Sequence, residues 1–110
     1  PFRDIRNAGV RICGGSDSGL TPVNPIGGIH AAVNHPVDAS RLSIEEALSM
    51  FTREAAWMVR EEGWKGELEI GRIADLAVVD RNIFRTNPKN IITTEVILTM
   101  KSGAVLYQNL

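Results

Sequence analysis

The chain has 110 residues, 44% apolar and 23% charged, with 12 Lys and Arg against 13 Asp and Glu. This composition is typical of one ordinary globular domain with a modest core, and it excludes a complete barrel enzyme of about 250 residues. The balanced charge indicates neither a nucleic-acid surface nor a polybasic membrane face. The apolar runs fall far short of the roughly 18 residues of a membrane span. We therefore expect no nucleic acid and no membrane among its partners.

Cys13 is the only cysteine, so an intramolecular disulfide and a cysteine-rich zinc motif are excluded. This cysteine usage favours a reducing compartment such as the cytoplasm. Because no base adjoins Cys13 in the sequence, we interpret it as a small buried hydrophobe rather than a nucleophile. The sequence begins at Pro1, which suggests truncation or processing, so the absent signal peptide does not fix the location of the parent protein.

The first predicted element is a short buried strand at Val10 to Cys13, which ends in a loop rich in glycine and serine. From residue 19 to residue 28, prolines and glycines predict irregular structure. Residues 29–33 then favour about two helical turns, which stop near Pro36.

The strongest helix prediction covers residues 44–62. Ser43 and Glu46 form a capping-box pattern before it, and Gly63 follows its end. Apolar residues at spacings of three and four give one stripe, and charged residues such as Glu54 belong to the remaining surface. The stripe consists of Ile44, Leu48, Phe51, Ala55 and Val59.

The remaining sequence changes to strand and turn patterns. Leu68 and Ile70 alternate with glutamates as in a half-exposed strand, and residues 74–80 are apolar on both faces, as in a strand buried on both sides. Residues 81–94 are polar and contain a proline, which predicts a surface connection. Residues 95–101 and 104–108 flank Ser-Gly, a pattern that predicts a hairpin.

Asp17 is the candidate catalytic residue. An aspartate directly after a buried strand, in a glycine-rich loop, occupies the position where barrel enzymes place catalytic carboxylates. The same residues also make ordinary turns, because Asp and Ser side chains hydrogen-bond to nearby backbone. From the local motif alone both interpretations remain open, and the turn is favoured.

The two histidines, His30 and His35, are the other candidate metal ligands. Their i, i+5 spacing turns them apart on a helix, so we interpret each as a surface or loop residue. The glycine pairs lack the spacing of phosphate-binding loops. Trp57 and Trp64 flank the end of the long predicted helix, where we expect them to pack over a helix-to-sheet junction.

Taken in order, several segments together resemble the C-terminal end of the amidohydrolase superfamily, closest to the branch called amidohydrolase family 3. They are Gly15-Ser16-Asp17-Ser18, Pro25, Ile29-His30-Ala31-Ala32-Val33, Leu42 to Leu48 with Phe51-Thr52, Gly66 to Asp80, and the Gly103 hairpin. The Gly66 to Leu76 stretch is the most specific of them, and Glu67 and Arg72 are mild departures from the pattern. The resemblance covers nearly the whole chain.

The resemblance implies an α/β fold divided into two parts. Residues 1–63 would supply the last strand, the active-site loop and an outer helix of a TIM barrel that binds metal. Residues 64–110 would supply strands of a small composite β-sandwich, which strands from the other end of the parent chain complete.

The resemblance also implies that Asp17 ligates a divalent metal, usually zinc, and serves as the catalytic acid and base in hydrolysis of an amide or other C–N bond in a small molecule. One aspartate cannot hold the metal alone. The family's other ligands include a His-x-His motif, and this sequence has none. We therefore expect a C-terminal portion of an enzyme that is inactive by itself.

A second hypothesis is a non-catalytic interaction module, derived from the same tail, that adds a partner's strand to its sheet edge. Asp17 would then be only a turn residue. In either case, the apolar helix face and the unpaired strand edges favour self-association.

Overall fold

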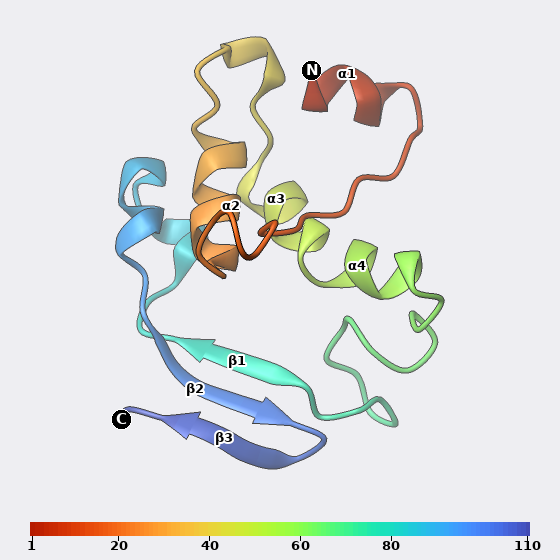
Figure 1. Ribbon diagram of the computed structural model, residues 1–110, viewed down its shortest axis with the longest axis vertical. Helices are drawn as coiled ribbons and strands as arrows, with labels where there is room; N and C mark the ends of the chain where they lie inside the picture. Colours follow the sequence, from red (N-terminus) through yellow and green to blue (C-terminus); the bar gives the residue numbers. More distant parts are fainter.

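The N-terminal part of the chain is helical and the C-terminal part forms a small sheet (Figure 1). The computed structural model describes residues 1–110 throughout. In chain order the elements are α1 (Phe2–Asn7), α2 (Pro25–Val33), η1 (Asp38–Ser40), α3 (Ile44–Met50), α4 (Arg53–Met58), β1 (Leu76–Val79), η2 (Ile83–Arg85), η3 (Pro88–Thr93), β2 (Val96–Lys101) and β3 (Ala104–Gln108). None of these helices has the length and hydropathy needed to cross a membrane.

Helix α2 confirms the predicted turns at residues 29–33 but begins earlier. The side chain of Asn24 caps it by accepting a hydrogen bond from the backbone N–H of Gly27 at 2.9 Å. Pro25 occupies the first turn, where a missing N–H breaks no helical hydrogen bond. The prediction of irregular structure up to residue 28 was therefore wrong for residues 25–28, because a proline that interrupts a helix can also start one.

The long helix predicted at residues 44–62 is two short helices, so its predicted length was wrong. The capping box is confirmed, since Ser43 Oγ accepts from the N–H of Glu46 and the Glu46 carboxylate accepts from the N–H of Ser43. Thr52 interrupts the helix with φ −126° and ψ −94°. Its hydroxyl donates to the carbonyl of Leu48 at 3.0 Å, a local hydrogen bond of the kind that competes with regular helix.

This interruption also divides the predicted apolar stripe. Val59 is 55% exposed rather than buried, and α4 ends at Met58 instead of reaching Gly63. Arg60, with a φ of 60°, turns the chain away soon afterwards. The predicted stripe therefore combined residues from two separate helices, because the apolar periodicity of the sequence does not reveal the interruption at Thr52.

The strands form one antiparallel sheet in the order β1-β2-β3. Ser102 and Gly103 have φ values of 50° and 82°, which suits a type I′ turn and confirms the predicted hairpin. Asp75 supports this turn by accepting a hydrogen bond from the N–H of Ser102 at 2.7 Å. Figure 1 shows that the sheet lies to one side of the helices, with β1 nearest to them and β3 farthest.

Two strand predictions were wrong in this region. The strand at β1 exists, but Ala77 and Val78 are exposed, so it is not buried on both sides. Leu68 and Ile70 belong to no strand and are largely exposed. A buried strand needs a layer against each face, and the helices pack with one another and with the connection after β1 instead.

The segment Val10 to Cys13 is not a strand, so this prediction was also wrong. It runs as an unpaired chain between α1 and the loop that contains Asp17 (Figure 1). Strand structure requires neighbouring chain to accept and donate its hydrogen bonds. Here the contact to a neighbouring backbone comes at Gly14, whose N–H donates to the carbonyl of Met50 at 2.9 Å.

The hydrophobic core lies between α2, α3 and the connection that follows β1. Its buried members are Ile29, Ala32, Val33, Leu42, Ala47, Met50 and Ile91. The prediction of a surface connection at residues 81–94 was wrong for Ile83 and Ile91, which are buried. With only 13 of 110 residues buried and a radius of gyration of 14.4 Å, against about 13 Å for a compact chain of this length, this core is small.

Glu46 gives the fold a dependence on pH. Its carboxylate faces Arg3 at 2.7 Å, and this contact, with the capping interactions of Ser43, lowers the pKa of Glu46 from 4.5 to about 2. A carboxylate with a lowered pKa stabilises the fold above its unfolded pKa and loses that contribution as pH falls toward the folded value. Between about pH 5 and pH 2 we expect a loss of about 1–2 kcal/mol, after allowance for solvent screening.

The check is chemical denaturation across this pH range. Glu46→Gln should remove most of the acid-dependent loss, because glutamine does not titrate. The matched control, Glu45→Gln, changes the preceding exposed glutamate of the same helix and should leave the loss intact. An unaltered acid profile in Glu46→Gln would contradict the assignment.

Candidate functional site

Asp17 lies in an exposed loop that hydrogen bonds hold in shape. The backbone N–H groups of Leu20 and Thr21 point to the Asp17 carbonyl at 3.2 and 3.4 Å. The hydroxyl of Thr21 donates to the carbonyl of Ser16, and the hydroxyl of Ser16 accepts from the N–H of Asn24 at 3.3 Å. The loop therefore returns directly to the start of α2.

The backbone of Asp17 adopts a φ of 48°, in the left-handed region. Among residues other than glycine, Asn and Asp adopt this region most readily, so the residue fits the turn that its motif favours. Its side chain, however, makes no hydrogen bond or ion pair within the chain, and the turn uses only its backbone carbonyl. The turn thus presents a free carboxylate to solvent.

An open hollow of about 380 Å³ lies beside this carboxylate. Its lining residues are Gly15, Ser16, Asp17, Thr21, Pro22, Asn24, Gly27, Gly28 and Phe51. The ring of Phe51 passes so close to Gly14 and Gly28 that a Cβ on either residue would lie 2.4 Å from it. The two glycines let Phe51 pack between the Asp17 loop and α2, and this packing forms the apolar side of the hollow.

The residues present do not form a metal site. No group of three or more His, Cys, Asp or Glu side chains in the chain is arranged to hold a metal ion. Nδ1 of His30 lies 3.2 Å from the side-chain amide of Asn34, and Nδ1 of His35 accepts from the N–H of Val37 at 3.1 Å. Asp17 therefore belongs to no such group within these 110 residues.

Three packing predictions were wrong around this region. Cys13 is half-buried rather than in the core, with its Sγ 2.9 Å from Sδ of Met58. Trp57 and Trp64 are 43% and 41% exposed, and each ring contacts a cation, Arg11 or Lys65. The half-exposed ring of each tryptophan packs against the guanidinium or ammonium group of a neighbour.

The sequence did not predict the buried position of Glu54. The helical pattern assigned it to the surface, yet it is 7% exposed and pairs with Arg11 at 2.5 Å. The contact with Arg11 holds the pKa of Glu54 below its ordinary value despite its burial. The only signal in the sequence was Arg11 within the predicted apolar strand. Arg11 and Glu54 are too far apart in the sequence for helix or strand patterns to connect them.

The family model described as Amidohydrolase family matches residues 1–107. The chain belongs to the amidohydrolase family. Among curated relatives, it is 26% identical over 117 residues to the putative amidohydrolase YtcJ of Bacillus subtilis (strain 168). That match covers 97% of this chain and 22% of YtcJ, so the chain spans about a fifth of the length of this amidohydrolase.

Solved amidohydrolase structures share this arrangement of elements. An amidohydrolase from Thermotoga maritima MSB8 superposes with a TM-score of 0.75 at 20% identity, over 98% of this chain and 26% of its own. Atrazine chlorohydrolase TrzN from Arthrobacter aurescens TC1, complexed with zinc, superposes with a TM-score of 0.73 at 30% identity, over 99% of this chain and 28% of its own. The mixed helical and antiparallel fold is thus shared with a segment of each of these two larger proteins.

Proposed function

We propose that these residues are the C-terminal portion of a metal-dependent hydrolase that cleaves amide or other C–N bonds in small molecules. The observation that carries the proposal is the free Asp17 carboxylate at the edge of an open hollow, in a chain of the amidohydrolase family. An unpaired carboxylate held by a fixed loop is suited to accept and return a proton.

In this proposal the chain contributes to two parts of the complete enzyme. Residues 1–63 bring the last barrel strand, the Asp17 loop and the outer helices, and residues 64–110 bring strands of a composite β-sandwich. The segment at residues 11–13 supports the first assignment, since these residues make no backbone hydrogen bond within the chain and are free to pair with an adjacent strand. The open edge of β3 supports the second.

Asp17 would be one ligand of the metal, and zinc is the best candidate because TrzN is complexed with zinc. Because the chain has no set of three ligand side chains, the remaining ligands would come from other parts of the enzyme. The isolated chain should then bind no zinc tightly and hydrolyse no amide. A bound metal would supply an activated water and a Lewis acid, and the contribution of this chain is the carboxylate of Asp17.

The test compares the 110-residue chain with the complete coding region that contains it, including any His-x-His strand upstream of Pro1. After zinc loading and dialysis, we expect about one zinc or more per molecule of the complete protein, with amide hydrolysis, and well below one per molecule of the chain alone. Stoichiometric zinc in the chain alone, with activity that Asp17→Asn abolishes, would show that the chain is self-sufficient. A complete protein without zinc or hydrolysis would refute the hydrolase.

A second function, the interaction module, has one observation in its favour. All residues of β3 are exposed, and Val105, Leu106 and Tyr107 present apolar surface at an open sheet edge. Such an edge can add a strand from a partner or from a second copy, which also supports the proposed self-association. The same comparison separates the two functions, because a coding region without further ligand motifs would favour the module.

A further inference from the structure

Glu54 is the only buried ionisable side chain in the structure. Its Oε2 lies 2.5 Å from Nε of Arg11, and the guanidinium of Arg11 also stacks on Trp57, 4.2 Å from the ring centroid. A buried carboxylate is costly unless a charged partner compensates it, and removal of that partner leaves an unpaired charge. The Arg11–Glu54 pair is therefore a part-buried ion pair, in which Glu54 is buried and Arg11 is partly exposed.

This contact holds the segment that leads to Asp17. Residues 11–14 have no strand partner and make few polar contacts with the rest of the protein. They are the Arg11–Glu54 pair, the Cys13 contact with Met58, and the hydrogen bond from Gly14 to Met50. Ile12 of this segment also packs against the hydrophobic core, and Asp17 follows Gly14 by three residues. The Arg11–Glu54 contact is thus the one ion pair that joins the segment before Asp17 to α4.

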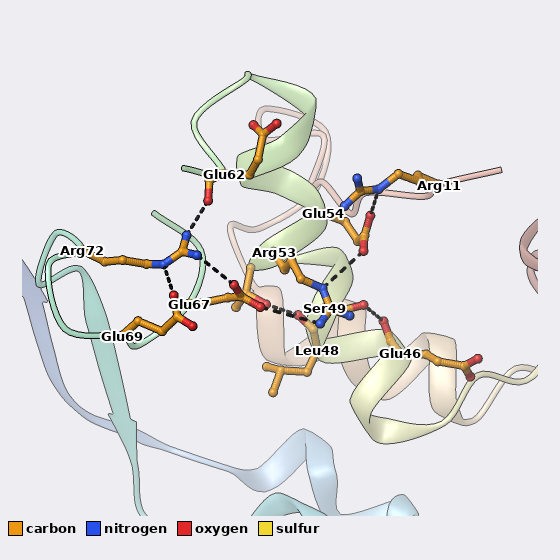
Figure 2. A network of polar contacts seen from close by, with 11 residues as sticks. Arg11, Glu46, Leu48, Ser49, Arg53, Glu54, Glu62, Glu67, Glu69 and Arg72 are labelled. Carbon is orange, nitrogen blue, oxygen red and sulfur yellow. Dashed lines mark hydrogen bonds and ion pairs between the residues drawn. The ribbon is translucent and has the colours of Figure 1, made fainter. Parts of the chain in front are cut away.

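The Glu54 carboxylate also belongs to a series of ion pairs that extends to the connection before the sheet (Figure 2). Nε of Arg53 lies 3.6 Å from Oε1 of Glu54, and another nitrogen of Arg53 lies 3.7 Å from Glu67. Glu67 in turn contacts Arg72 at 3.3 Å. These outer pairs are more exposed and contribute little individually, which makes Glu54 the central member.

We propose that Glu54 is a positioning residue of the amidohydrolase site. This proposal rests on the function proposed above. The Glu54 carboxylate holds Arg11, and Arg11 holds the segment that carries the catalytic carboxylate of Asp17. Neither Glu54 nor Arg11 lines the hollow beside Asp17, so their loss affects the chemical step and leaves substrate binding nearly unchanged.

The experiment uses the complete enzyme with Glu54→Gln, and with Arg11→Gln as a second variant. Glu54→Gln is the milder change because it removes the buried charge and keeps an amide oxygen to accept from Arg11, whereas Arg11→Gln leaves the Glu54 carboxylate without its nearest cation. We expect kcat to fall about 10- to 100-fold in Glu54→Gln, with KM within about twofold, since a misplacement near 1 Å can cost about 100-fold. The double variant should be no slower than the slower single one, because the two residues act as a unit.

Amide hydrogen exchange provides a readout that does not depend on activity. In both variants, peptides covering residues 11–17 should exchange at least about tenfold faster, while peptides of β2 and β3 keep their rates. Glu67→Gln is the matched control from the more exposed part of this series of ion pairs, and it should change neither kcat nor exchange at residues 11–17.

Unchanged exchange at residues 11–17 and unchanged kcat in both variants would overturn the positioning role. Faster exchange with unchanged kcat would overturn it too, because the contact would then be only structural. If the proposed function itself fails, the complete protein will show no hydrolysis, or Asp17→Asn will leave its hydrolysis intact. A failure limited to the positioning role leaves both the hydrolysis and the effect of Asp17→Asn in place.

Discussion

Asp17→Asn is expected to lower kcat/KM of the complete enzyme by about 10²- to 10⁴-fold, the usual contribution of a positioned acid or base. The substitution is nearly isosteric, and asparagine tolerates the left-handed backbone that gives Asp17 a φ of 48°. The carboxylate makes no hydrogen bond or ion pair within the 110 residues, so its loss leaves no polar group of these residues unsatisfied. The expected loss of activity is therefore not a loss of fold.

The measurement is steady-state hydrolysis, with thermal unfolding and zinc content determined on the same preparations. Asp17→Gly is a second variant, because glycine adopts positive φ freely and preserves the turn while it removes the carboxylate. Asp38→Asn is the control: Asp38 is an exposed aspartate of η1, paired only with Arg41, and its replacement should leave kcat/KM unchanged. Activity within about threefold of the parent in both Asp17 variants would reduce Asp17 to a turn residue.

Ile91→Ala is expected to destabilise the protein by about 3 kcal/mol. Ile91 is the only large side chain that is completely buried, and it joins the core residues of α2 and α3 from η3. Truncation of a buried isoleucine removes its transfer free energy and leaves a cavity, at a cost of about 2–5 kcal/mol. With so small a core, a loss of this size is a large share of the total stability.

Urea denaturation followed by circular dichroism gives the difference in free energy of unfolding. The adjacent Ile92 provides the matched control, since it has the same side chain in the same element but is 46% exposed. Ile92→Ala should cost no more than about 1 kcal/mol. Equal losses in the two variants would mean that Ile91 is not the residue that joins the C-terminal connection to the helices.

Local patterns predicted the elements that short-range chemistry specifies. The Ser43–Glu46 capping box and the Ser102–Gly103 hairpin form as expected, because each depends on residues a few positions apart. The order of these motifs along the chain also indicated the amidohydrolase family, which the family comparison confirms. Predictions of buried strands were less accurate, because a buried strand depends on neighbouring chain that the local pattern does not specify. The unpaired segment before Asp17 and the exposed β1 residues are the examples.

For the candidate site, the sequence by itself determined that Asp17 lies in a glycine-rich loop and that no His-x-His motif accompanies it. Only the tertiary structure decided that the Asp17 carboxylate is free, that Phe51 lies against Gly14 and Gly28, and that Glu54 is buried beside Arg11. The physical reason is distance along the chain. Capping and turn preferences act over three or four residues, whereas Arg11 and Glu54 are 43 positions apart and meet only in the folded chain.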